Sequence, residues 1–430
     1  MGEPWAFGLR GGMNGPMRLA PWALLVAALL HHNPVLGQAT SARQQSLGGA
    51  GVASAKAQNS AFMNPALAQR ARDSDRIEIT APVVTFVGAD ESNVRQGVEN
   101  LQDSIEALQA GLGGPDEAML RSEAAAGLTS LAGGEVFADA GIGASFVLPR
   151  GPISLGLTWR SFVDLRGLTS IDPADLATIN TTVNPLDLDQ LSSEILVPSV
   201  RVDEFGFTFA TDFSLFGLPS SAGVTPKFQS VESRLYSVSV SQADQSDILS
   251  GLSDGDTRRD DIANVDLGVA VDLSPRWRAG VATRNLLKHT FEAPALAGTS
   301  YAYQVEPLTT AGLAYGQDGW MVTADLDLNS TSRFEGLGAS RFLRIGGELS
   351  LGTPLAMQGL PGHPQQSGAE GASNDAVLIR AGFLTDLDST QQDLWSLGIA
   401  FPTYLQAPLE FTLAVGTEAF GAGLQFGWSI

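Results

Sequence analysis

Strict alternation of apolar and polar residues is the dominant pattern of this chain, and it is clearest between residues 420 and 430. One parity of this segment carries Phe420, Ala422, Leu424, Phe426, Trp428 and Ile430. The other parity carries only Gly, Gln and Ser. Because successive side chains of a β-strand point to opposite faces, the segment predicts a strand with one apolar and one small, polar face. We expect the apolar face to lie against lipid rather than water.

The same period of two recurs along most of the chain. Its clearest further examples are residues 265–273, 320–328, 343–351 and 409–416. Each is about ten residues long, the length that a tilted strand needs to cross a bilayer. About fourteen such segments are expected, an even number as in bacterial single-chain barrels. They start near Ile77, Val136, Pro152, Val202, Ala222, Ile262, Arg276, Val305, Gly319, Phe342, Ala376, Leu394, Ala407 and Phe420. The predicted fold class is all-β, a transmembrane antiparallel β-barrel.

The connections between these segments alternate between short and long along much of the chain. Tight turns are expected at residues 149–151, 274–275 and 317–318. Long loops are expected at residues 88–135, 165–200, 241–261 and 288–304. This alternation is typical of barrels with long external loops and short periplasmic turns. The Gly- and Pro-rich stretch 352–375 departs from it, because it is long where a short turn is expected.

The first long loop has a different period. Apolar residues recur at steps of three and four over residues 94–112, and the pattern continues over residues 123–131. This spacing predicts an amphipathic helical excursion packed over the barrel mouth.

The N-terminus has the pattern of an export signal. Arg10 and Arg18 flank an apolar run over residues 19–30, and a small-residue stretch with a predicted cleavage after Gly37 or Ala39 follows. Residues 1–39 are therefore interpreted as an upstream extension and a cleaved signal peptide, with translation starting at Met1 or Met17. Residues 40–76 are interpreted as an N-terminal plug, and residues 77–430 as the barrel.

The plug prediction depends on a segment rich in small residues, 46–67. Its key positions are Gly48, Gly49, Gly51, Asn64, Pro65 and Ala66. The glycines allow close backbone packing, and Asn-Pro gives a rigid turn shortly before the first strand. A linker without a gating role is the alternative.

Composition narrows the possible chemistry. The chain has no cysteine, which excludes disulfides and thiolate sites, and its formal net charge of −21 argues against direct nucleic-acid binding. The acidic loop segments lack metal-ligand spacing, so neither a metal nor a cofactor is predicted. After signal removal only His289 and His363 remain, and no catalytic residue is predicted. An outer-membrane hydrolase would need a serine or carboxylate beside His289.

Charged residues occupy the polar parity of several strands, and in a barrel they would face the lumen. They are Asp266, Asp272, Arg278, Arg284, Asp325, Asp327, Arg344, Glu348 and Arg380. Both a polar web that stabilises the interior and a transport path fit this pattern. A soluble sandwich would place the same charges in water, so parity alone does not exclude that fold. On the apolar parity, Trp277, Trp320 and Trp428 are predicted to form a belt at the periplasmic membrane interface.

Two motifs carry a resemblance. LGGAGVA at residues 47–53 and FMNPAL at residues 62–67 resemble the plug region of FadL-like outer-membrane proteins. Residues 46–430 as a whole resemble the TraF-type conjugal-transfer barrel family. The strand motifs that carry this likeness are GVTPKFQ at 223–229, VATRNL at 281–286 and ADLDL at 324–328. The resemblance implies a FadL-like barrel of about fourteen strands.

The resemblance also implies two functions for a non-enzymatic barrel in the cell outer membrane. One is passive transport, with hydrophobic small molecules as candidate solutes, and the other is an envelope role in conjugal plasmid transfer. The expected partners are outer-membrane lipids and the barrel-assembly machinery. A structural or adhesive surface barrel whose long loops bind a partner is the alternative.

Overall fold

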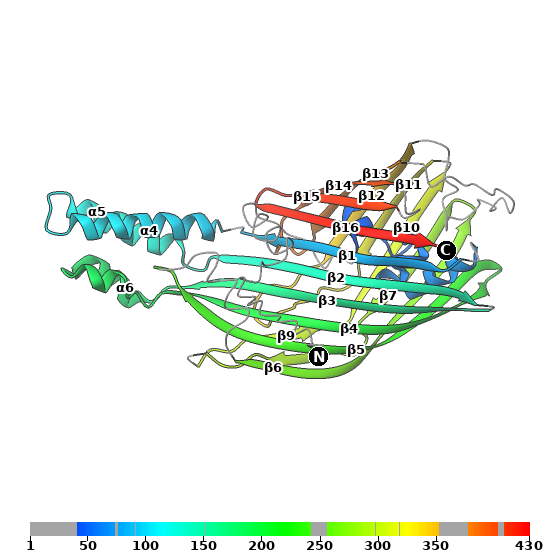
Figure 1. Cartoon of the computed structure of the whole chain (residues 1–430), viewed down its shortest axis with the longest axis horizontal. Helices are drawn as coiled ribbons and strands as arrows, with labels where there is room; N and C mark the ends of the chain where they lie inside the picture. Colours follow the sequence, from blue (N-terminus) through cyan, green and yellow to red (C-terminus); the bar gives the residue numbers. More distant parts are fainter. Residues whose placement is uncertain are drawn as a thin grey trace, which may run out of the picture. The chain divides into compact units, whose positions relative to one another are not determined.

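Fourteen antiparallel strands close into a barrel, in which β1 pairs with β2 on one side and with β16 on the other (Figure 1). The computed structural model describes residues 41–73, 76–90, 92–150, 152–241, 256–296, 298–317, 319–351, 377–402 and 408–430. The order around the barrel is β1, β16, β15, β14, β13, β12, β11, β10, β7, β6, β5, β4, β3 and β2. Strands β8 and β9 form a separate two-stranded sheet.

The barrel strands fall into a long and a short group. The first strand, β1 (Glu78–Ala89), has 12 residues. The long strands that follow it are β2 (Glu135–Arg150), β3 (Ile153–Ser170), β4 (Glu194–Leu215), β5 (Leu218–Ser239) and β6 (Thr257–Ser274). The short strands are β7 (Trp277–Arg284), β10 (Leu308–Gln317), β11 (Trp320–Asp327), β12 (Phe342–Leu351), β13 (Val377–Asp386), β14 (Leu394–Phe401), β15 (Leu409–Val415) and β16 (Ala419–Ser429).

The other elements lie before the barrel and in its loops. Before β1 come α2 (Ala42–Ser46), η1 (Ala57–Asn59), α3 (Ser60–Met63) and η2 (Pro65–Asp73). The loops hold α4 (Val94–Gly111), α5 (Glu117–Ser130), α6 (Pro173–Thr181), α7 (Pro185–Leu188), β8 (His289–Glu292) and β9 (Ala302–Val305). Helices α4 to α6 lie beyond one end of the strands in Figure 1.

The predicted barrel and its strand number are confirmed, but the uniform strand length is wrong. Strands β2 to β6 have 16 to 22 residues. The outer ends of β2 to β5 continue past the short strands and pack against the loop helices, as Ile195 and Val197 of β4 do with Leu101 and Leu128. At the outer end of β4, residues 195–200 are buried on both faces of the strand, so the period of two fades and does not predict the extra length.

Three loop elements also differ from expectation. The first helix is close to its predicted range, whereas α5 begins at Glu117, six residues before the predicted start. The strand expected from Val305 is two pieces: β9 ends at Val305, and β10 begins at Leu308. Helices α6 and α7 were not predicted. Each begins at a proline that follows a capping Asp172 or Asn184, a signal that short polar helices share with turns.

The outer surface of the barrel is apolar. Large exposed side chains follow the parity opposite to the buried charges; examples are Val84, Ile142, Phe207, Val269, Val281, Leu313, Val322, Leu326, Ile345, Ile379 and Leu413. A soluble sandwich would bury such side chains between two sheets, and a closed barrel with an apolar exterior is the arrangement that lipid requires. Among the described helices, none has the length and apolar character needed to cross a membrane. The predicted signal peptide, the 352–375 stretch and His363 lie outside the described residues.

Candidate functional site: a chamber in the barrel

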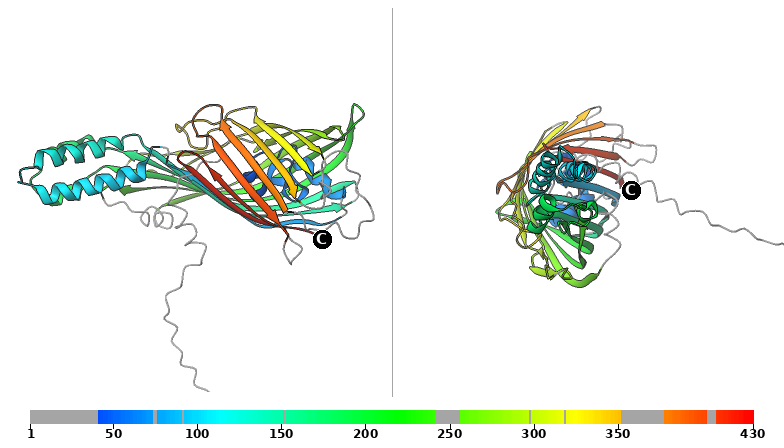
Figure 2. Two further views of the ribbon diagram at one scale, coloured as in Figure 1. Left: turned by 90° about the horizontal axis from the view of Figure 1, so that it is seen from above. Right: turned by 90° about the vertical axis from the view of Figure 1, so that its left-hand side faces the viewer.

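The N-terminal residues 41–73, called the inner segment below, lie inside the ring of strands (Figure 2). Helix α2 contacts β13 to β16, and η2 contacts β2 to β6, so the segment touches most of the wall. Gly48 shows how close the approach is. Its φ is +67°, and a Cβ atom there would lie 2.4 Å from the carbonyl oxygen of Phe383. Only glycine fits this position without displacing the wall.

Hydrogen bonds fix the inner segment to two strands of the wall, β11 and β6. The Oδ2 atom of Asp325 accepts from the backbone N–H groups of Gly51 at 2.7 Å and Val52 at 2.8 Å. The Asn64 side chain donates to Val52 O at 2.8 Å and to Val269 O at 3.1 Å. Its own oxygen accepts from the Ala66 N–H group at 3.1 Å. Asn64 thus closes a turn and binds strand β6 at the same time.

Buried ion pairs add to this attachment. Glu348 Oε2 lies 2.5 Å from Arg380 Nε and 3.3 Å from Arg43 Nε of the inner segment, and Arg380 also pairs with Glu410 at 2.7 Å. Lys56 lies in the same region, and burial lowers its pKa although Glu410 and Glu348 oppose the shift. A second anchor joins Arg70 to Asp272 at 2.8 Å. Removing either anchor leaves charge uncompensated in a low-dielectric interior.

The β11–β12 loop, residues 328–341, folds into the barrel from the other end. Arg333 Nη1 lies 2.5 Å from Asp139 Oδ2 of β2 and 2.7 Å from Asp164 Oδ2 of β3. Burial opposes the charge of Arg333, but the two carboxylates more than offset this and raise its pKa well above the ordinary value. Strands β2 and β3 stand across the barrel from β11 and β12, so this contact spans the lumen.

The β8–β9 hairpin supports the same closure. Tyr303 and Phe334 pack edge to face with ring centroids 5.3 Å apart, and Phe291 belongs to the same buried cluster. Ser332 N–H donates to Glu306 Oε2 at 2.9 Å. The hairpin and the β11–β12 loop thus form one packed cap.

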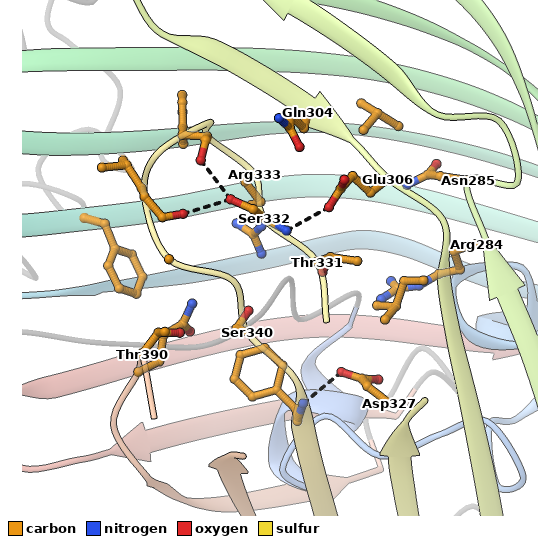
Figure 3. A pocket seen from close by; sticks show the side chains of 18 of the residues that line it. Arg284, Asn285, Gln304, Glu306, Asp327, Thr331, Ser332, Arg333, Ser340 and Thr390 are labelled. Carbon is orange, nitrogen blue, oxygen red and sulfur yellow. Dashed lines mark hydrogen bonds between the residues drawn. The ribbon is translucent and has the colours of Figure 1, made fainter. Parts of the chain in front are cut away.

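Between the inner segment and this cap lies a chamber of about 320 Å³ (Figure 3). Val52 and Met63 line it from below, and Ser332 and Phe334 from the cap. The chamber wall is rich in arginine and includes Arg160, Arg166, Arg284 and Arg344. Its volume lies at the lower end of the range of small-molecule pockets.

Most wall charges are paired. Arg160 forms two hydrogen bonds with Glu204, at 2.9 and 3.1 Å. Arg344 forms two with Asp327, at 2.7 and 2.9 Å. Lys227 lies 2.9 Å from Asp266 and 3.1 Å from Glu204. The paired arrangement holds these side chains in fixed positions.

The structure places the predicted lumen-facing residues as follows. Asp266, Asp272, Arg278, Asp325, Asp327, Arg344, Glu348 and Arg380 are buried, and Arg284 is half-buried in the chamber wall. Arg284, Asp325, Asp327 and Arg344 meet at the chamber. Glu348 and Arg380 instead join the inner segment's network, and Asp272 pairs with Arg278 at 2.7 Å.

The predicted tryptophans lie near other aromatic side chains. Tyr315 links Trp277 and Trp320, with ring centroids at 4.8 and 5.3 Å, and Trp428 stacks on Phe426 at 6.0 Å. A shared height along the barrel axis stays a prediction.

His289 does not form a catalytic pair in the described part of the chain. It is half-buried on β8, its ring is stacked on Phe291 at 6.2 Å, and its Nε2 atom has no hydrogen-bond partner. Within the described residues there is also no group of three or more His, Asp or Glu side chains placed to hold a metal ion.

Sequence reasoning missed Arg160 and Arg333 of the chamber lining, and also Glu204 and Lys227, which pair beside Arg160. Arg160, Glu204 and Lys227 lie on the inward parity of long strands, and their charge within alternating segments is a signal that could have found them. Arg333 carried no such signal, because its partners are 194 and 169 residues away.

Comparisons with known proteins found one family model and several solved structures that match this chain. A family model described as "F plasmid transfer operon, TraF, protein" matches residues 61–327. The Pseudomonas putida toluene transporter TodX matches with a TM-score of 0.48 and 14% identity, covering 92% of this chain and 97% of that chain. The CymD monoaromatic hydrocarbon channel matches with a TM-score of 0.47 and 11% identity, covering 91% and 97%. Among curated proteins there is no significant match.

Proposed function

We propose that this chain, which belongs to the F plasmid transfer operon TraF protein family, is a gated, non-enzymatic channel for small solutes in the bacterial outer membrane. The observation that carries the proposal is the chamber between the inner segment and the cap. A barrel with a purely structural role gains stability from a filled interior, because every void forfeits contacts. This interior instead keeps space lined by polar and charged groups.

The rest of the molecule fits this role. The apolar exterior suits outer-membrane lipids as the surrounding solvent, and insertion by the barrel-assembly machinery follows from that location. The inner segment and the cap act as two barriers in series, so neither of them alone sets the permeability of the channel. The mixed lining favours small solutes that carry a polar group over wholly hydrophobic compounds.

Deleting residues 46–67 should leave an inserted barrel with several-fold higher conductance in planar bilayers. The deletion removes the contacts at Gly51 and Val52 and much of the chamber floor. Adding Arg333→Ala, which removes the contact across the lumen, should raise conductance further, and by more than either change alone. Barriers in series predict this order, because the remaining one limits flow.

Arg341→Ala is the matched control for Arg333→Ala. Arg341 lies in the same loop but is 41% exposed, and its contact with Asp388 measures 3.6 Å. Exposed pairs of this kind contribute little, so this change should not alter conductance. Heat-modifiable migration on gels verifies that each variant is folded. Unchanged conductance in the folded double variant would exclude a channel gated by these elements.

A second function, an envelope role in conjugal plasmid transfer, is supported by the loop helices together with the family description. Helices α4 to α7 pack on one buried cluster beyond the barrel. Met119 on α5, Val183 between α6 and α7, and Leu186 on α7 are 56%, 86% and 64% exposed. Exposed apolar side chains on an external arm favour a protein partner. This role and the channel are separable, because the arm lies away from the chamber.

Replacing residues 94–131 by a short Gly-Ser linker should therefore lower plasmid transfer frequency between cells while conductance stays unchanged. The triple change Met119→Ser, Val183→Ser and Leu186→Ser should have the same effect without removing a helix. Normal transfer with both variants would exclude the conjugation role of the arm.

A further inference from the structure

We propose that Arg284 is the binding residue for a small organic carboxylate in the chamber. This inference deepens the proposed channel function by naming a class of solute, and it rests on that function. Arg284 is the last residue of β7 and lines the chamber beside Asn285. Figure 3 shows its side chain on the side of the chamber where Thr331 and Asp327 lie.

Arg284 differs from the other cations of this wall because it has no partner. Arg160, Arg333 and Arg344 each form an ion pair at 2.9 Å or less, and Arg166 lies 3.4 Å from Asp164. Among the described residues, Arg284 forms neither an ion pair nor a hydrogen bond. A guanidinium with five donors, held half-buried without an acceptor, is poised for an anion from the chamber.

The acids around Arg284 are engaged elsewhere. Asp266, on the neighbouring strand β6, accepts from Lys227 at 3.0 Å and from the Asn285 N–H group at 2.7 Å. Asp327 accepts from Arg344, from Thr310 at 2.7 Å and from the Phe342 N–H group at 3.1 Å.

Three further acids line the chamber, Glu135, Glu306 and Asp325, and the last two accept hydrogen bonds. Glu306 accepts from Lys288 at 2.6 Å and from the Ser332 N–H group at 2.9 Å, and Asp325 accepts from the inner segment. Asp266, Asp327 and Glu306 cannot turn to Arg284 without abandoning a charged or backbone donor.

The backbone beside Arg284 places a second hydrogen-bond donor, Asn285, at the chamber wall. Asn285 has a φ of 52°, in the left-handed region that non-glycine residues seldom adopt. This turn ends β7 and keeps Asn285 at the chamber wall next to Arg284, where its carboxamide adds a donor of the kind that binds a carboxylate oxygen.

The charge pattern favours a carboxylate over a phosphate. One unmatched cation compensates one negative charge, and Asp325, Asp327 and Glu306 in the lining would repel a second charge. A guanidinium also matches the planar carboxylate with two parallel hydrogen bonds. Val305, Leu308 and Phe342 in the same lining provide an apolar surface for the body of the molecule.

The test measures binding of sodium benzoate to the full chain in detergent by isothermal titration calorimetry. Arg284→Gln should weaken binding at least about tenfold, the usual range for a charge-assisted pair. Arg284→Lys keeps the charge but lacks the planar guanidinium with its two parallel donors. Its affinity for benzoate should therefore lie between the affinities of the natural protein and of Arg284→Gln. Arg276→Gln is the matched control: it makes the same change just before β7, at an exposed site outside the chamber, and should bind like the natural protein. Benzamide, the neutral analogue, should bind at least about tenfold more weakly than benzoate.

Several results would overturn the proposal. These are an absence of benzoate binding by the natural chain, equal affinity of the natural chain and folded Arg284→Gln, equal affinity for benzamide, and tighter binding of inorganic phosphate than of benzoate. The assay needs no membrane, so it separates this inference from the channel. Arg284-dependent binding by a protein without conductance would uphold the site and reject transport, and the reverse result would reject the site alone.

Discussion

Replacing Arg380 by Met should destabilise the barrel by about 3–5 kcal/mol, the typical cost of breaking a buried ion pair by removing one partner. Arg380 is 1% exposed and lies between Glu348 at 2.5 Å and Glu410 at 2.7 Å. Without it, Glu410 loses its ion-pair partner, and Glu348 keeps only Arg43 at 3.3 Å. The expected readout is a lower temperature for loss of the heat-modifiable folded band.

Two comparisons make this result specific to the buried charge. Arg201→Met removes a cation of similar size from β4, but Arg201 is 55% exposed and its pair with Asp203 should contribute about 0–1 kcal/mol. Adding Glu410→Gln to Arg380→Met should restore part of the stability, because the neutral amide needs no counter-charge and Glu348 still pairs with Arg43. Equal melting temperatures of the Arg380→Met and Arg201→Met variants would show that the buried charge of Arg380 does not stabilise the barrel.

The sequence predicts the barrel well because a strand's period is a local property. Asp325 and Leu326 differ by one position, and this alone fixes which of them enters the lumen: Asp325 is 1% exposed and Leu326 is 39% exposed. The same rule gives the strand number, since each crossing repeats the alternation. It fails at the outer end of β4, where residues 195–200 are buried on both faces and the alternation disappears.

The chamber is a different kind of feature, because it depends on contacts between distant segments. Parity gives Arg284, Asp327 and Arg344 as lumen-facing, but not that Arg344 and Asp327 pair while Arg284 stays single. That outcome follows from Lys227 holding Asp266, a contact between two strands. The cap is still less local, because Arg333 reaches two strands on the opposite wall, and no spacing in its loop encodes them.

The cost of placing a charge on the outer surface of the barrel depends on its depth in the membrane. Ile345 and Leu351 lie on the same face of β12, and both are 46% exposed. Ile345 pairs with Ala324 near the middle of β11, whereas Leu351 lies two residues beyond Leu349, the partner of Trp320. Exposure therefore does not distinguish the two positions, but their height along the strand does.

Ile345→Arg should block insertion, whereas Leu351→Arg should be nearly neutral. An arginine on the lipid face costs about 2–4 kcal/mol at the midplane and about 0–1 kcal/mol near the interface. Ile345→Ala, which adds no charge, separates the electrostatic cost from the loss of the side chain. The measurement is the fraction of each variant that reaches the heat-modifiable form on refolding into liposomes. Equal fractions for the two arginine variants would show that Trp320 does not mark a membrane interface, and the predicted tryptophan belt would then lose its support at this strand.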